Sequence, residues 1–138
     1  MGSGFIDVCV DGWELVEHSR LNTLLIGPPT VTGRLVESLS PQLVGPVVRL
    51  RPHESLTFAG EDPVGTVILH DIGELLLSDQ RRFLDWLDRA SARPRVISTA
   101  PVPIIEKVAQ GAFLPALYYR LNLFYVDVAR VGNDVRPL

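Results

Sequence analysis

Short apolar runs alternate along the chain with longer segments whose apolar positions recur every three or four residues. The short runs are rich in β-branched residues and are bounded by Gly, Pro or polar residues, which is typical of buried strands. Five such runs are predicted as strands: 23–26, 47–50, 66–69, 96–99 and 123–128. This alternation predicts an α/β fold with a parallel sheet, because parallel strands require crossover connections.

The segments between these strands carry helical periodicity. The clearest helix is predicted at 78–90, where Ser78 is a suitable N-cap and the apolar residues within 83–87 form one stripe. Further helices are predicted at 13–19, 32–39 and 103–110, with a helical turn at 114–119. The expected core combines strand and helix residues and includes Leu24, Leu25, Ile26, Val67, Ile68, Leu69, Leu84, Leu87, Val96, Ile97 and Leu121.

Length and charge fit one globular domain that does not bind nucleic acid directly. The chain has 138 residues and a formal net charge of −3, whereas a domain whose overall charge attracts nucleic acid is basic. Cys9 is the only cysteine, which excludes an internal disulfide and a cysteine-based metal cluster. No apolar run approaches the ~18 residues of a membrane span, and no secretory signal is recognisable, so we expect a cytoplasmic protein without membrane contact.

Three sequence blocks resemble the AAA+ ATPase domain of sigma-54 transcription activators. Residues 65–75 read Gly-Thr-Val-Ile-Leu-His-Asp-Ile-Gly-Glu-Leu, where that family has Gly-Thr-Leu-Phe-Leu-Asp-Glu-Ile-Gly-Glu-Leu. Residues 80–84, Gln-Arg-Arg-Phe-Leu, follow as the family's next helix would. Residues 117–122, Leu-Tyr-Tyr-Arg-Leu-Asn, match a motif of the family. The blocks occur in the family's order, and the resemblance extends over about residues 21–128.

The resemblance implies a three-layer α/β/α sandwich with a five-stranded parallel sheet in the order 5-1-4-3-2, the core of the P-loop NTPases. It predicts a single, shortened AAA+-like domain over residues 1–138, with no helical lid after the fifth strand. The family's sigma-factor-binding loop has no counterpart in the short connection 51–65, and its DNA-binding helix-turn-helix has none either.

The segment that corresponds to the family's phosphate-binding loop is degenerate. Residues 27–35 read Gly-Pro-Pro-Thr-Val-Thr-Gly-Arg-Leu, without the lysine that places a positive charge on the phosphates. Lys107, the only lysine of the chain, lies elsewhere, so Arg34 is the one available substitute. Pro28 and Pro29 also lack the N–H groups that such a loop directs at phosphate. The vestigial nucleotide site implied by the resemblance consists of Gly27, Thr30, Thr32, Gly33, Arg34 and Asp71.

The other catalytic positions of the family are also altered. His70 and Asp71 stand where the family has an Asp that holds Mg²⁺ and a Glu that positions water, and imidazole is a poor ligand for Mg²⁺. The sensor segment has become 100–103, Ala-Pro-Val-Pro, without a side-chain donor. Of the family's arginines that reach a neighbouring subunit, only Arg120 remains, for a subunit contact or for an ion pair within the chain. We therefore expect no catalytic residue and no metal site.

These losses predict that the chain is a non-catalytic AAA+-like interaction or regulatory module linked to bacterial sigma-54-type transcription control. The expected partner is a second copy of the chain or a full AAA+ activator, and no cofactor is expected. The alternative is a weak ATP-binding domain with residual or no hydrolysis, in which Arg34 replaces the lysine and Asp71 or Glu74 holds Mg²⁺. A third possibility is a receptor for another small anion at the start of the same helix, because helix N-termini attract anions.

Overall fold

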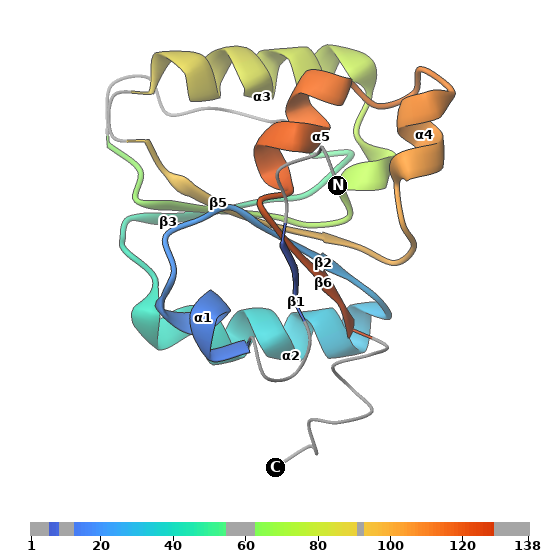
Figure 1. Ribbon diagram of the computed structural model, residues 1–138. Helices are drawn as coiled ribbons and strands as arrows, with labels where there is room; N and C mark the ends of the chain where they lie inside the picture. Colours follow the sequence, from blue (N-terminus) through green and yellow to red (C-terminus); the bar gives the residue numbers. More distant parts are fainter. Residues whose placement is uncertain (1–5, 9–12, 55–62, 91–92, 129–138) are drawn as a thin grey trace.

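The computed structural model describes residues 6–8, 13–54, 63–90 and 93–128 and shows a parallel sheet covered by helices on both faces (Figure 1). Within these residues the sheet has the strand order β1-β6-β2-β5-β4-β3, and every pair is parallel. The strands are β1 (Ile6–Val8), β2 (Thr23–Ile26), β3 (Val47–Leu50), β4 (Thr66–Leu69), β5 (Arg95–Ala100) and β6 (Phe124–Asp127).

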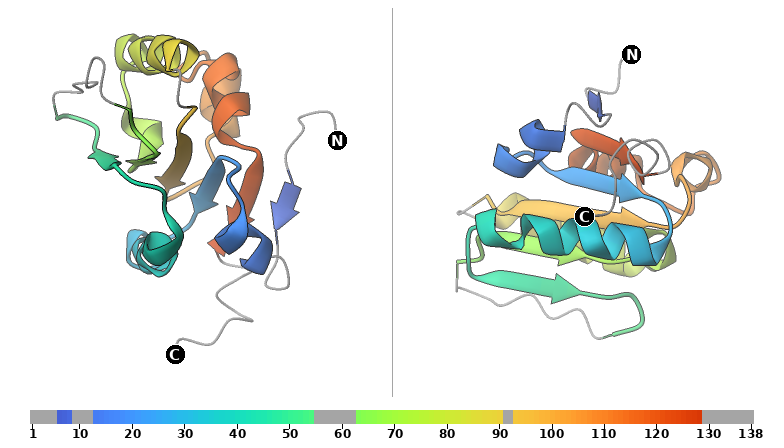
Figure 2. Two further views of the ribbon diagram at one scale, coloured as in Figure 1. Left: turned by 90° about the vertical axis from the view of Figure 1, so that its left-hand side faces the viewer. Right: turned by 90° about the horizontal axis from the view of Figure 1, so that it is seen from below.

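The helices form the outer two layers of the sandwich. Figures 1 and 2 show α1 and α2 on one face of the sheet and α3, α4 and α5 on the other. The helical elements are α1 (Trp13–His18), α2 (Pro29–Leu39), α3 (Leu77–Arg89), α4 (Ile105–Ala109) and α5 (Pro115–Leu121), with 3-10 turns η2 (Ser40–Gln42) and η3 (Ile72–Glu74). No helix in the described part of the chain is long and apolar enough to cross a membrane.

Two hydrophobic clusters, one on each face of the sheet, form the core. Leu24 and Ile26 belong to the cluster beneath α3 and α5, whereas Leu25 belongs to the cluster beneath α2. This division follows from the alternation of side chains along a strand. Because both of their faces are covered, β2, β4 and β5 are buried at every position.

The predicted three-layer sandwich and the order of the five predicted strands are confirmed, since β6-β2-β5-β4-β3 is the order 5-1-4-3-2. The strand β1, which pairs with β6, was not predicted, because three residues are too few to display a period. Leu84 is a correction to the predicted core, since it is only partly buried. Phe83 and Phe113, which are fully buried, belong in the core instead.

The boundaries of several helices differ from those predicted. Helix α2 begins at Pro29 instead of residue 32, with proline in its first turn, where the missing N–H costs nothing. The predicted helix 103–110 is the shorter α4, and the predicted turn 114–119 is the full helix α5. The earlier start of α2 matters most, because it changes the candidate phosphate site.

Candidate functional site

A hollow of about 270 Å³ lies where the carboxyl ends of β2, β4 and β5 meet. Ligands of open α/β sheets bind at this edge, outside the carboxyl ends of the strands. The hollow therefore occupies the place where a P-loop protein would hold nucleotide. Its lining includes Gly27, Thr32, Gly33, Arg51, Asp71 and Thr99.

The connection between β2 and α2 contains only two residues, Gly27 and Pro28. Residues 30–34, which stand in the family's phosphate-loop segment, consequently lie inside the helix. The backbone N–H groups of Val31 and Thr32 both donate to the carbonyl oxygen of Pro28, at 2.9 and 3.0 Å. Because Pro28 and Pro29 have no N–H at all, this turn offers few donors to a phosphate group.

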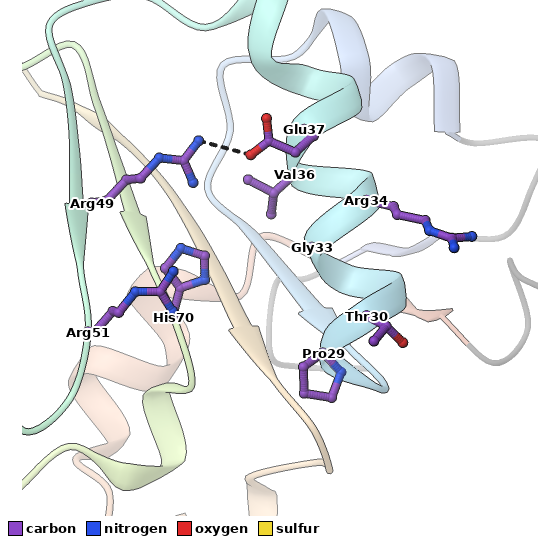
Figure 3. A pocket seen from close by; sticks show the side chains of 9 residues that line it. All are labelled: Pro29, Thr30, Gly33, Arg34, Val36, Glu37, Arg49, Arg51 and His70. Atoms are coloured by element: carbon purple, nitrogen blue, oxygen red, sulfur yellow. Dashed lines mark hydrogen bonds and ion pairs between the residues drawn. The ribbon is translucent and has the colours of Figure 1, made fainter.

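The predicted nucleotide-site residues separate into two groups. Gly27, Thr32, Gly33 and Asp71 line the hollow at the strand ends, whereas Thr30 and Arg34 do not. Figure 3 shows the side chain of Arg34 leaving α2 on the side away from β3 and β4. Arg34 is therefore not directed at the place where a phosphate-loop lysine would act.

The position of Gly33 inside α2 predicts that its replacement by alanine raises the stability of the protein. A Cβ atom added at Gly33 meets nothing within 4 Å. Gly33→Ala should therefore stabilise the protein by about 0.5–1 kcal/mol, because alanine loses less backbone entropy in a helix. The midpoint of urea unfolding measures this change. A loss of stability would indicate that the segment is not helical.

A hydrogen bond joins the loop after β4 to the last residues of β5. Asp71 has the left-handed backbone conformation, with φ of 52°, which aspartate tolerates better than most residues. Its N–H donates to Thr99 Oγ1 at 3.1 Å, and Thr99 is buried. Sequence analysis missed Thr99, because the sensor segment was read one residue later, at 100–103. The only available signal was a polar residue near the end of an apolar strand.

His70, in the place of the family's Mg²⁺-binding aspartate, is a partly buried imidazole. Its Nε2 atom is buried and has no hydrogen-bond partner in the described part of the protein. Burial, followed by the positive charges of Arg51 and Arg49, lowers the pKa of His70. A neutral imidazole beside two arginines does not fit Mg²⁺, which prefers oxygen ligands. Nor do the described residues contain a group of three or more His, Cys, Asp or Glu side chains suited to a metal.

The lowered pKa of His70 predicts a pH dependence of stability. As pH falls below 6.5, the unfolded imidazole takes up a proton while the folded one remains neutral, so the free energy of unfolding should decrease until the pH passes the lowered pKa. His70→Gln should flatten this decrease, measured by urea unfolding between pH 7.5 and 5. His53→Gln, which removes an exposed imidazole, is the matched control. An unchanged slope in His70→Gln would contradict the burial of this group.

Two other positively charged side chains, those of Arg120 and Lys107, contact acceptors within the chain. Arg120 on α5 pairs with Asp88 on α3 at 2.6 Å, which identifies the intramolecular carboxylate for this arginine. Lys107 donates to the carbonyl oxygen of Gly73 at 3.1 Å and lies 3.9 Å from Glu74. Neither Lys107 nor Glu74, the alternative metal-binding acid, lines the hollow at the strand ends.

Comparison with known proteins identifies related sequences. The family model described as "Sigma-54 interaction domain" matches residues 13–131. The nitrogen fixation protein VnfA of Azotobacter vinelandii is 29% identical over 167 residues, which cover 91% of this chain and 32% of VnfA. The HTH-type transcriptional regulatory protein TyrR of Haemophilus influenzae is 35% identical over 88 residues, or 54% of this chain and 28% of TyrR. The chain thus spans about a third or less of these relatives.

Solved structures show the same fold. NtrX from Brucella abortus in complex with ATP matches with a TM-score of 0.69 and 18% identity, over 86% of this chain and 34% of NtrX. The P-loop NTPase domain of a sigma-54 transport activator from E. coli matches with a TM-score of 0.60 and 16% identity, over 85% of this chain and 89% of that domain. At these identities the likeness concerns the fold alone.

Proposed function

The chain belongs to the sigma-54 interaction domain family, and on that premise we propose that it is a non-catalytic interaction or regulatory module of bacterial sigma-54-type transcription control. The observation that carries the proposal is the two-residue connection between β2 and α2, which leaves no loop to surround a triphosphate. The module would act in the cytoplasm, by contact with a second copy of itself or with a full AAA+ activator.

The chemistry of phosphoryl transfer supports the absence of catalysis. This reaction depends on positioned charges: backbone N–H groups and a lysine on the phosphates, an acid on Mg²⁺ and a group that orients water. In this chain Arg34 is directed away from the hollow, and His70 replaces the metal-binding acid. The backbone N–H of Asp71 is bonded to Thr99. ATP and Mg²⁺ therefore do not fit the residues present.

The first test is a titration of the full chain with ATP and Mg²⁺, with a sigma-54 activator that has an intact phosphate loop as positive control. We expect no saturable heat at millimolar ATP and no phosphate release above the buffer rate. Arg34→Lys should not restore turnover, because a lysine at this position would still point away from the hollow. Turnover that Asp71→Asn abolishes would contradict the proposal and favour the weak ATPase.

The second test concerns the protein partner. We expect sedimentation of the chain with an excess of a full AAA+ activator to give a complex, or the chain alone to self-associate at micromolar concentration. Binding should change the ATPase rate of the activator, since AAA+ subunits act as an assembly. If the chain stays monomeric and leaves the activator unchanged, the interaction role is wrong even when ATP hydrolysis is absent.

A further inference from the structure

A second and larger hollow, of about 510 Å³, lies between α2 and the edge of the sheet formed by β3 and β4 (Figure 3). This volume falls in the range of small-molecule sites, which is roughly 300–1,000 Å³. Basic side chains approach it from the sheet, and its only acidic lining residue is Glu37 on α2. The hollow shares Arg51 and His70 with the one at the strand ends, so these two residues lie where the two hollows adjoin.

Three arginines line the hollow, and the side chain of Arg34 leaves α2 on the far side. Of the two arginines on the sheet side, one is already paired and the other is not. Arg49 on β3 contacts Glu37 at 3.1 Å, as the dashed line in Figure 3 shows. Arg51 follows β3 and is exposed, and within the described part of the chain no carboxylate lies at ion-pair distance from it. The guanidinium of Arg51 therefore keeps its capacity for a bidentate contact with an oxyanion.

The sheet holds His70 beside Arg51. Leu50 and Leu69 are register partners in the parallel pair β3–β4, and the N–H of His70 donates to the carbonyl oxygen of Leu50 at 3.0 Å. The residues that follow these two strands are thereby fixed next to each other. The Nε2 atom of His70 is buried without a partner, and a buried polar atom in that state costs free energy. The imidazole therefore borders the hollow through its other atoms.

We propose that this hollow binds a small phosphomonoester, with the phosphate group held by the guanidinium of Arg51 beside the imidazole of His70. Phosphate is favoured over a single carboxylate because its greater charge strengthens a bidentate contact with the guanidinium. The organic part of the ligand would lie along α2, next to Val36 and Gly33. The site does not use the N-terminus of α2, and it does not depend on whether the domain hydrolyses ATP.

The test is an NMR titration of the full chain with ribose 5-phosphate, in parallel with inorganic phosphate and with succinate. We expect saturable shifts of the amide signals of Arg49, Arg51, His70 and the middle of α2, with succinate binding more weakly than ribose 5-phosphate. Arg51→Ala should weaken binding about tenfold or more, the loss expected for a charge-assisted contact. The affinity of Arg51→Lys should fall between those of the wild type and Arg51→Ala, because an ammonium group keeps the charge but cannot make the bidentate contact.

Arg81→Ala, on an exposed position of α3, is the charge-matched control and should bind like the wild type. Thermal unfolding of each variant shows that it is folded, as expected for substitutions of exposed arginines. The proposal is overturned if no shift saturates, if Arg81→Ala weakens binding as much as Arg51→Ala, or if succinate binds as tightly as ribose 5-phosphate. Saturable ATP heat that Arg51→Ala abolishes would come from this hollow, whereas phosphate release tests the proposed function alone, so the two proposals can fail separately.

Discussion

Gly65→Ala is expected to destabilise the protein by roughly 3 kcal/mol or more, among the larger effects of a single substitution. A Cβ atom at this position would collide with the backbone carbonyl of Val44 and would lie 2.8 Å from the carbonyl oxygen of Gly45. These are backbone atoms, which cannot rotate away as the end of a long side chain can. The segment before β3 would have to move.

That movement would disturb three neighbouring strands. The N–H of Gly65 donates to the carbonyl oxygen of Pro46 at 3.0 Å, and its own carbonyl oxygen accepts from the N–H of Arg95 at 3.1 Å. A shift at Gly65 therefore strains the start of β3, β4 and β5 together. Glycine is thus required at position 65, the first of the Gly-Thr motif, because only glycine fits this close approach of two backbones.

Urea unfolding measures the effect, and Gly33→Ala is the matched control. The same chemical change at Gly33 meets open space in a helix and should raise stability. The two variants should therefore shift the unfolding midpoint in opposite directions. Equal shifts would contradict the close packing of Gly65 against residues 44–45.

Arg95→Met is expected to cost about 3 kcal/mol or more, because it leaves buried acceptors without their donor. Arg95 is the first residue of β5 and is only 7% exposed. Its guanidinium donates to the carbonyl oxygens of Leu21 and Val16, at 2.9 and 3.0 Å, and to Thr23 Oγ1 at 3.1 Å. These contacts hold α1 and the start of β2 against β5.

The charge of Arg95 persists despite its burial. Burial, with a contribution from the charge of Arg20, lowers the pKa of Arg95 to about 10, so the guanidinium remains protonated at neutral pH. Arg95→Lys should recover only part of the loss, because an ammonium group cannot reach three acceptors with the geometry of a planar fork. If Arg95→Lys were as stable as the wild type, the three contacts of the guanidinium would not be needed for stability.

Thermal and urea unfolding of Arg95→Met, Arg95→Lys and Arg81→Ala give the comparison. Arg81 is exposed on α3, and its replacement should change stability by no more than about 0.5 kcal/mol. From most to least stable, the expected order is therefore Arg81→Ala, Arg95→Lys and Arg95→Met.

The candidate site was only partly accessible to sequence analysis. The missing lysine and the His70–Asp71 pair are facts of the residue order, so the prediction that the usual phosphate and metal ligands are lost needed no structure. The start of α2 did not follow, because the prolines at 28 and 29 suit both a loop and the first turn of a helix. Packing of α2 against the sheet decided in favour of the helix, and with it the direction of Arg34.

The family resemblance implied the order of the strands in the sheet, whereas the sequence by itself determined the α/β class and five of the described strands. It could do so because buried parallel strands are continuous apolar runs, and this signal is local. The tertiary structure alone decided the pairing of β1 with β6 and the approach of Arg51 to His70. Both depend on the register of parallel strands that are far apart in the chain. Nearly every residue type offers the same backbone hydrogen-bonding groups, so the residue sequence does not reveal which strands these bonds join.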